Sequence, residues 1–339
     1  MHSMKEGLAE IHKLFGEGAG GRGHTFPNFT RLPTGIISLD VTLGGGFPMG
    51  AVSIIYGVEG SGKTSLATRL VAQYQRRFPK KAVVWVDVEN EHDPDWKKLH
   101  GVDLNSLYVL KPTSAEQCSD MAGEAAMASD CGLLIVDSLA AMASYDQLEK
   151  TSDKTVVAGA AKPSTTMLKK VSAGIVEHTK AGDHLTVIYI NQIRMKIGFV
   201  MGNPEILPGP TLQNYQAFLK LRLTGNPVLQ EKIAAVPIYS EQIARIKKKK
   251  FATVRSEAKW STILYPHKGL KPLDVNNHRL AENLLEECGF LTKHSKTEWL
   301  LHGEVYPTKT AAVEAALADY DETVKDIVNH LQKLYGDPA

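Results

Sequence analysis

Runs of apolar, often β-branched residues alternate with amphipathic stretches between about residue 31 and residue 223. Such continuous runs are typical of strands buried on both faces of a sheet. The predicted strands are AVSIIYG (51–57), KAVVWVDVE (81–89), SLYVLKP (106–112), CGLLIVDS (131–138) and LTVIYIN (185–191). Helical stretches separate most of them, beginning with KTSLATRLVAQYQRRF (63–78). The alternation predicts an α/β fold with a mostly parallel sheet and helices on both faces.

The two ends of the chain have different patterns. GLAEIHKLF (7–15) has an apolar stripe at helical spacing, and Gly16 is placed to end that helix. A glycine-rich tether and a short predicted strand, TFPNFTRL (25–32), follow. We therefore divide the chain into an N-terminal oligomerisation helix and arm (1–30), a core (31–270) and a small C-terminal α/β domain (271–339).

Within the predicted core, two late segments indicate an added β-hairpin or edge strands. They are IARIKKKKFATV (243–254) and WSTILYP (260–266). The C-terminal part turns helical from about residue 273, with a small β insert in EWLLHGEVYP (298–307).

Composition excludes several classes of protein. The apolar fraction of 43% and the charged fraction of 22% are those of an ordinary globular chain. The net charge is only +2, so affinity for a polyanion has to come from local patches. The three cysteines have neither paired nor metal-like spacing, which favours a reducing compartment. No apolar run approaches the roughly 20 residues that span a bilayer, and the N-terminus lacks a signal-peptide pattern.

A phosphate-binding loop is the clearest motif. GVEGSGKTS (57–65) fits the G-x-x-x-x-G-K-[ST] pattern between a predicted strand and a predicted helix. Its glycines let backbone N–H groups curl around phosphate oxygens, Lys63 supplies a positive charge, and the Thr64 hydroxyl suits Mg²⁺. The candidate binding residues of this loop are Gly57, Glu59, Gly60, Ser61, Gly62, Lys63, Thr64 and Ser65.

Acidic residues follow two other predicted strands. Asp137 ends LLIVD and is a candidate Mg²⁺ ligand, with a helix N-cap as the alternative. Glu89 ends another strand and can orient or deprotonate a water, although a solvated acidic turn explains the spacing about as well. Trp96 either packs a helix or offers a flat surface to a base.

The segment YINQIRMKIGFVMGNPEILPGP (189–210) opens as a strand and then mixes cations, bulky apolar residues, glycines and prolines. It is too long and too rich in glycine and proline for a core element. A surface loop with incidental cations is one reading of it, and a ligand-binding loop is the other.

Taken together, the chain resembles the bacterial and phage RecA-type recombinases over nearly its whole length. The stretches that carry the resemblance are LPTGIISLDVTLGGGFPMG (32–50), IYGVEGSGKTS (55–65), DVENEHDP (87–94), LLIVDSLAAM (133–142) and INQIRMKIGFVMGNPE (190–205). The resemblance implies a RecA-like ATPase core and a divergent member of the family.

The resemblance also implies roles for residues at the nucleotide site, with ATP and Mg²⁺ as cofactors. Glu89 matches the family's catalytic glutamate, and Asp137 matches its Mg²⁺-side aspartate. Asp93 and Trp96 fall where the family contacts adenine. Gln192 matches the glutamine that senses the γ-phosphate and couples it to the DNA loop. Two further matches, Lys248 and Lys250, correspond to lysines that reach ATP bound on the neighbouring subunit.

For the 189–210 segment, the resemblance implies the family's second DNA-binding loop. Cations can neutralise phosphates, apolar side chains can wedge between bases, and glycines allow close backbone approach. The candidate DNA-binding residues there are Arg194, Met195, Lys196, Ile197, Gly198, Met201 and Gly209. Pro210 stands where the family has a second glycine. In the first DNA loop (149–170), Gly159 aligns, Pro163 replaces an expected arginine, and Lys162 and Lys170 are plausible substitutes.

The expected function is therefore a DNA-dependent ATPase that forms helical filaments on single-stranded DNA and exchanges strands with homologous duplex DNA. Expected partners are DNA, further copies of the chain with ATP at their interface, and single-strand-binding and loader proteins, in the cytoplasm of a bacterium or phage-infected host. Two alternatives stay open. One is an ATP-gated single-strand-binding filament without efficient exchange, and the other is a hexameric helicase-like motor.

Overall fold

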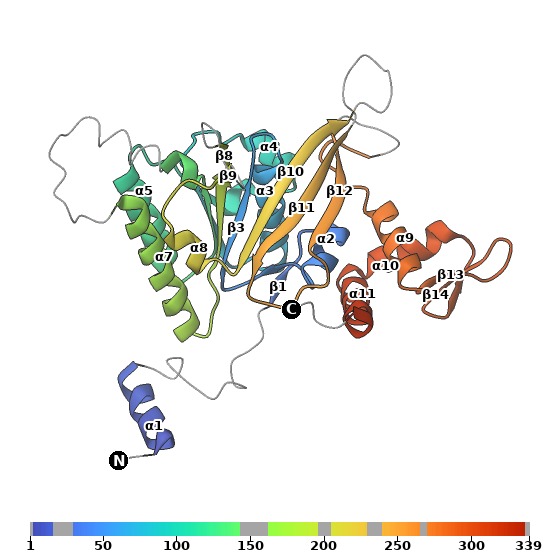
Figure 1. Ribbon diagram of the computed structural model, residues 1–339, viewed down its shortest axis with the longest axis horizontal. Helices are drawn as coiled ribbons and strands as arrows, with labels where there is room; N and C mark the ends of the chain where they lie inside the picture. The colour runs from blue at the N-terminus through green and yellow to red at the C-terminus, as the bar shows by residue number, and fades with distance from the viewer. Residues whose placement is uncertain are drawn as a thin grey trace.

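The computed structural model describes residues 3–15, 30–142, 162–195, 205–228, 239–264 and 270–335. Its main element is an eight-stranded sheet in the order β12-β11-β10-β3-β7-β6-β4-β5 (Figure 1). The strands are β3 (Val52–Gly57), β4 (Ala82–Asp87), β5 (Leu107–Leu110), β6 (Cys131–Asp137), β7 (Thr186–Gln192), β10 (Leu219–Val228), β11 (Tyr239–Lys249) and β12 (Glu257–Ile263).

The strands from β10 through β5 are parallel neighbours, whereas β11 and β12 are antiparallel additions at one edge. The predicted parallel sheet and the late hairpin are therefore both confirmed. The β10 strand had not been predicted, although it joins the hairpin to the phosphate-loop strand β3.

Two helical layers cover the sheet. Helix α3 (Lys63–Arg77) packs on one face through Leu66, Leu70 and Tyr74. Helices α5 (Ala115–Met127) and α7 (Pro163–Lys180) cover the other face (Figure 1). Consecutive strand residues such as Ile54 and Ile55 are both fully buried, on opposite faces. This explains why the strands have continuous apolar runs rather than alternation.

The remaining elements are short or peripheral. They are α1 (Met4–Phe15), β1 (Arg31–Leu32), α2 (Ile37–Thr42), β2 (Phe47–Pro48), α4 (Pro94–Leu99), the 3-10 helix η3 (Leu104–Ser106), β8 (Arg194–Met195), β9 (Glu205–Ile206) and α8 (Leu212–Gln216). The N-terminal helix begins three residues before the predicted range. Of the predicted strand 25–32, residues 25–29 lie outside the described residues, and β1 covers only its end.

The C-terminal part contains α9 (Asn277–Glu287), β13 (Leu291–Lys293), β14 (Trp299–Leu301), β15 (Glu304–Tyr306), α10 (Lys309–Ala318) and α11 (Tyr320–Tyr335). Its apolar cluster is separate from those of the sheet but includes Ile37 and Val41 of α2. Helix α2 thus belongs to both parts of the molecule. The predicted boundary at residue 271 stays a prediction.

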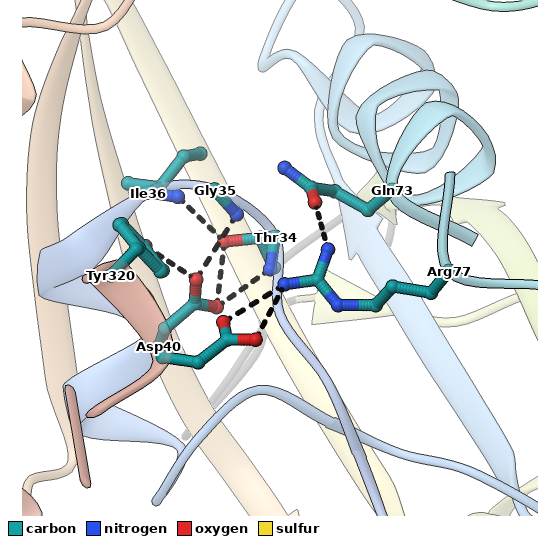
Figure 2. A network of polar contacts seen from close by, with 8 residues as sticks. Thr34, Gly35, Ile36, Asp40, Gln73, Arg77 and Tyr320 are labelled. Carbon is teal, nitrogen blue, oxygen red and sulfur yellow. Dashed lines mark hydrogen bonds and ion pairs between the residues drawn. The ribbon is translucent and has the colours of Figure 1, made fainter. Parts of the chain in front are cut away.

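Polar contacts reinforce this joint (Figure 2). Tyr320 donates from its hydroxyl to Oδ2 of the fully buried Asp40 over 2.7 Å. Asp40 also accepts hydrogen bonds from the backbone and hydroxyl of Thr34, both at 2.8 Å. Arg77 of α3 donates to both carboxylate oxygens of Asp321 at 2.9 and 3.2 Å. The start of α11 is therefore fixed to the core at two points.

Candidate functional site

The phosphate loop lies between β3 and α3, as the sequence predicts. A Cβ on Gly57 would lie 2.2 Å from the carbonyl oxygen of Leu223, so β10 approaches too closely for a side chain there. Gly62 has a φ of +89°, in the left-handed region that favours glycine, immediately before α3 begins. These two positions explain in physical terms why the motif has glycines there.

Lys63 and Thr64 occupy the first turn of α3. The Lys63 ammonium donates to the Val58 carbonyl over 2.8 Å, and burial lowers the pKa of Lys63. The Thr64 hydroxyl donates to Oδ2 of Asp137 over 3.2 Å. A hydroxyl and a carboxylate are thus presented together at the mouth of the loop, which is the donor set that a Mg²⁺ ion with phosphate and water ligands would use.

Asp137 is 8% exposed at the end of β6. Burial, followed by the negative charge of Glu89, raises the pKa of Asp137 to about 7. A bound cation would favour its ionised form. No group of three or more His, Cys, Asp or Glu side chains that could hold a metal occurs among the described residues. The Thr64 hydroxyl and the Asp137 carboxylate would leave most positions around a Mg²⁺ ion to phosphate and water oxygens.

Glu89 is displaced from its predicted place, because β4 ends at Asp87 and Glu89 lies in the turn that follows. Asp87 shapes this turn by accepting from the backbone N–H groups of Glu91 and His92 at 3.1 and 3.0 Å. The turn stays at the sheet edge because the Glu89 N–H donates to the Asp137 carbonyl over 3.3 Å.

The Glu89 carboxylate is held from two sides. Its Oε1 accepts hydrogen bonds from the Ser138 hydroxyl and, over 3.3 Å, from Nε2 of Gln192. Gln192 ends β7 and is the last sheet residue before the 189–210 segment leaves the core. The carboxylate therefore faces inward, which the solvated acidic turn considered from the sequence would not require.

A cavity of about 350 Å³ joins these groups. It is lined by Ile36, Glu59, Gly60, Gly62, Lys63, Thr64, Ser65, Leu66, Arg69, Glu89, Glu91, Trp96, Asp137, Gln192, Ser240, Gln242, Trp260, Thr262, Leu264 and Leu273. This volume suits a small organic ligand. Sequence reasoning missed the contribution of the late hairpin, because Gln242 and Trp260 belong to no local motif.

Of the two predicted adenine contacts, Trp96 lines the cavity and Asp93 does not. Trp96 is 37% exposed, and its ring packs against that of His100 with 5.1 Å between centroids. The Asp93 carboxylate caps α4 by accepting from the N–H groups of Asp95 and Trp96 at 2.9 and 3.1 Å.

Lys248 and Lys250 lie far from the phosphate loop of their own chain. Lys249 between them pairs with Leu219, which pairs with Ser53 at the beginning of β3, whereas the phosphate loop follows the end of β3. The ammonium of Lys248 contacts the Asn214 carbonyl, and that of Lys250 donates to the Tyr215 carbonyl over 3.1 Å. Both lysines are thereby held on α8.

The stem of the predicted DNA loop is a short ribbon in which β8 pairs with β9. Arg194 and Met195 are exposed on it. The returning chain is held by Asn191, whose Nδ2 donates to the Pro208 carbonyl over 2.8 Å and to Gln213 over 3.0 Å. Gly209 follows with a φ of +98°. Lys196, Ile197, Gly198 and Met201 lie outside the described residues.

The first predicted DNA loop is described only at its end. Gly159 lies outside the described residues, and Lys162 is exposed immediately before α7. Lys170 forms an ion pair with Asp120 of α5 at 2.7 Å. In this structure, Lys170 therefore links α7 to α5, the two helices that cover the same face of the sheet.

Comparison with known proteins adds to this geometry. A family model described as the RecA N-terminal domain matches residues 2–270. Protein RecA of Aquifex pyrophilus is 34% identical over 231 residues, which are 66% of this chain and 63% of that protein. Protein RecA of Thermus thermophilus is 31% identical over 309 residues, covering 89% of this chain and 85% of that protein. Protein RecA of Thermus aquaticus is 31% identical over 308 residues, with the same two shares.

Proposed function

This chain belongs to the RecA family, and from that membership we propose that it is an ATP-dependent recombinase that assembles as helical filaments on single-stranded DNA. In this proposal it pairs the bound strand with homologous duplex DNA, exchanges strands and hydrolyses ATP in a DNA-dependent manner. We place it in the cytoplasm of a bacterium or of a phage-infected host, where loader and single-strand-binding proteins are its expected partners. Among the described residues, no helix has the length and apolarity to cross a membrane.

The observation that carries the proposal is the hydrogen bond from Gln192 to Glu89. Gln192 is at the root of the segment proposed to bind DNA, and Glu89 lines the cavity proposed to bind nucleotide. An event at either site that moves one of these side chains changes the environment of the other. This is the kind of link that a DNA-dependent ATPase requires.

At the nucleotide site, backbone N–H groups of the loop and the Lys63 ammonium bind phosphates. Thr64 and Asp137 hold Mg²⁺, which supplies charge neutralisation on the phosphate oxygens when bound. Glu89 orients a water molecule and accepts its proton, while Ser138 and Gln192 fix the direction of the carboxylate. Trp96 offers its ring to the base.

For DNA, we propose that Arg194 neutralises a backbone phosphate and that Met195, which is 59% exposed, contacts bases. Lys196, Ile197, Gly198 and Met201 complete the binding loop in this proposal, with Gly209 at its base. The clamp of Asn191 and Gln213 on Pro208 holds that base in place.

The proposed filament gives a role to Lys248 and Lys250, which lie at the end of the sheet opposite the phosphate loop. Lys248 and Lys250 cannot serve the phosphate loop of their own chain, and in a filament they would serve that of the next subunit. Helix α1 has Met4 79% exposed and Leu14 70% exposed, so an apolar side is available for docking onto a neighbour. Each nucleotide would then be shared by two subunits.

The decisive experiment measures ATP hydrolysis with and without single-stranded DNA, with Lys63→Ala as the control, and images the same mixtures by electron microscopy. DNA-stimulated turnover together with helical filaments is the expected result. Closed rings with turnover would instead indicate a helicase-like motor. Filaments without turnover would indicate a binding scaffold, for which Pro210 is the specific sequence departure because it has no N–H for a phosphate.

A further inference from the structure

A second cavity of about 420 Å³ lies at the joint between the sheet and the C-terminal helix α11. Its lining residues are Arg31, Pro33, Gly44, Gly45, Arg77, Tyr320, Asp321, Val324, Lys325, Val328, Asn329 and Gln332. None of them lines the nucleotide cavity. The volume is within the range of sites that bind small organic molecules.

Contacts between α11 and the core fix the walls of this joint cavity. One wall is a single side of α11, because its residues recur at intervals of three and four. That wall is fixed to the core by the Tyr320–Asp40 hydrogen bond and the Arg77–Asp321 ion pair (Figure 2). The cavity is therefore preformed and does not need closure to exist.

Arg31 is the unusual member of the lining. Its guanidinium lies over the Phe251 ring, 4.0 Å from the ring centroid. Its Nη1 is buried and has no hydrogen-bond partner among the described residues. Burial lowers the pKa of Arg31 to about 10. A charged donor removed from water without a partner is costly, and guanidinium groups in such places are normally paired.

The other two cations of the lining already have partners. Arg77 is paired with Asp321, and Lys325 is paired with Glu322 at 2.9 Å. The cavity therefore contains one cation whose charge no carboxylate of the described chain balances. A water molecule in the cavity would leave that charge unbalanced. An oxyanion in the cavity would balance it, because a guanidinium binds carboxylate and phosphate groups through parallel, charge-assisted hydrogen bonds.

We propose that the joint cavity binds a phosphate oxyanion, free or as the head of a small phosphate ester, with Arg31 as its main ligand. The Asn329 and Gln332 amides of α11 offer hydrogen bonds to a polar ester group. The ligand would contact the core through Arg31 and α11 through Asn329 and Gln332. Its binding would therefore stabilise the attachment of the C-terminal helix.

The test uses the full chain with Lys63→Ala, so that the phosphate loop does not bind the probe. Inorganic phosphate and glycerol 3-phosphate are each titrated by isothermal calorimetry, with chloride keeping the ionic strength constant. We expect one saturable site, weakened about tenfold to a hundredfold by the added change Arg31→Gln, as removal of a charge-assisted hydrogen bond predicts. Arg255→Gln is the matched control, because Arg255 pairs with Glu287 outside the cavity.

The two probes separate the two sources of the oxyanion. Equal affinity assigns the cavity to the free ion, whereas tighter binding of glycerol 3-phosphate assigns it to an ester. Should Arg31→Gln fold poorly, hydrogen exchange in the Lys63→Ala chain gives a second readout, in which phosphate slows exchange in α11 and leaves α5 unchanged. Absence of saturable binding, equal affinity in the Arg31→Gln chain, or unaltered exchange in α11 would each overturn the proposal.

Discussion

Gln192 at the end of β7 donates a hydrogen bond to Glu89 in the turn after β4, over 3.3 Å between Nε2 and Oε1. The two side chains come from strands that β6 separates in the sheet, since β6 pairs with both β4 and β7. Their contact bridges the strand between them and joins the cavity to the root of the DNA loop.

For Gln192→Ala, we expect ATP binding to remain and the DNA stimulation of hydrolysis to fall about tenfold or more. A hydrogen bond to a charged group contributes about 1.5–3 kcal/mol, and here it is the direct link between the two sites. The ratio of kcat with and without single-stranded DNA measures the effect. Gln117→Ala, which alters a glutamine on the exposed start of α5, is the control; an unchanged ratio in Gln192→Ala would show that the link is not used.

For Glu89→Gln, turnover should fall by about 10²–10⁴-fold, because a general base is lost while size is kept. The dissociation constant for ATP should change little. Glu91→Gln is an informative control, since Glu91 also lines the cavity but has no assigned catalytic role. An equal loss of turnover in the two variants would show that hydrolysis depends on the negative charge of the cavity and not on Glu89 as a specific base.

Arg194→Ala should weaken binding to single-stranded DNA of every sequence. The slope of log affinity against log salt should decrease by about one, as the loss of one phosphate contact predicts. Fluorescence anisotropy at several salt concentrations measures both quantities. Lys180→Ala, at the far end of α7, should leave the slope unchanged, and the same slope in Arg194→Ala would contradict the loop assignment.

Asp137 predicts a pH dependence of stability in the chain free of nucleotide and divalent metal. Its pKa is raised from 3.8 to about 7 in the folded chain, which therefore binds the proton more tightly than the unfolded chain. The protonated Asp137 carboxyl contributes to the free energy of unfolding at low pH, and this contribution is lost as pH rises from 3.8 to about 7.

Relative to wild type, Asp137→Asn should therefore gain stability as pH rises from 4 to 7, by up to about 4 kcal/mol. Urea unfolding of both chains at pH 5, 6, 7 and 8 with a chelator present tests this. A stability difference that is constant with pH would mean that the carboxyl group is not destabilised by burial.

Tyr320→Phe should lower the free energy of unfolding by about 1–3 kcal/mol, because it leaves the buried Asp40 without one of its donors. Tyr306→Phe removes a hydroxyl whose hydrogen bond to Glu304 is exposed, and should cost less than about 0.5 kcal/mol. Equal effects of the two changes would show that the contact between Tyr320 and Asp40 contributes little to the joint.

The sequence was most informative where local chemistry decides structure. The buried strands were predictable because both faces of the sheet are covered, and the phosphate loop because Gly57 and Gly62 meet steric demands within one short segment. The Thr64–Asp137 contact was also foreseeable, since the phosphate loop after β3 and the end of β6 lie at the same edge of the parallel sheet. These features need no knowledge of distant partners.

Other features depend on partners far along the chain. Gln242 and Trp260 line the cavity because the β11–β12 hairpin lies beside β10. No local sequence pattern predicts that position. The capping role of Asp93 follows from where α4 begins. The unpaired Nη1 of Arg31 lies in a guanidinium that stacks on Phe251, which is 220 residues further along the chain.

The pairing of β10 with β11 contains one irregularity with a larger consequence. Lys220 pairs with Lys248 and Leu221 with Ile246, so Lys247 is an extra residue in the ladder. Ile246 consequently packs toward the α3 layer, whereas Lys248 reaches α8 on the opposite face. In a regular strand, two residues separated by one would share a face. The direction in which Lys248 points is thus set by the number of paired residues. Deleting Lys247 would make Lys248 the direct neighbour of Ile246 and keep it on the α8 face, whereas a ladder in which Lys247 paired regularly would turn Lys248 toward the α3 layer.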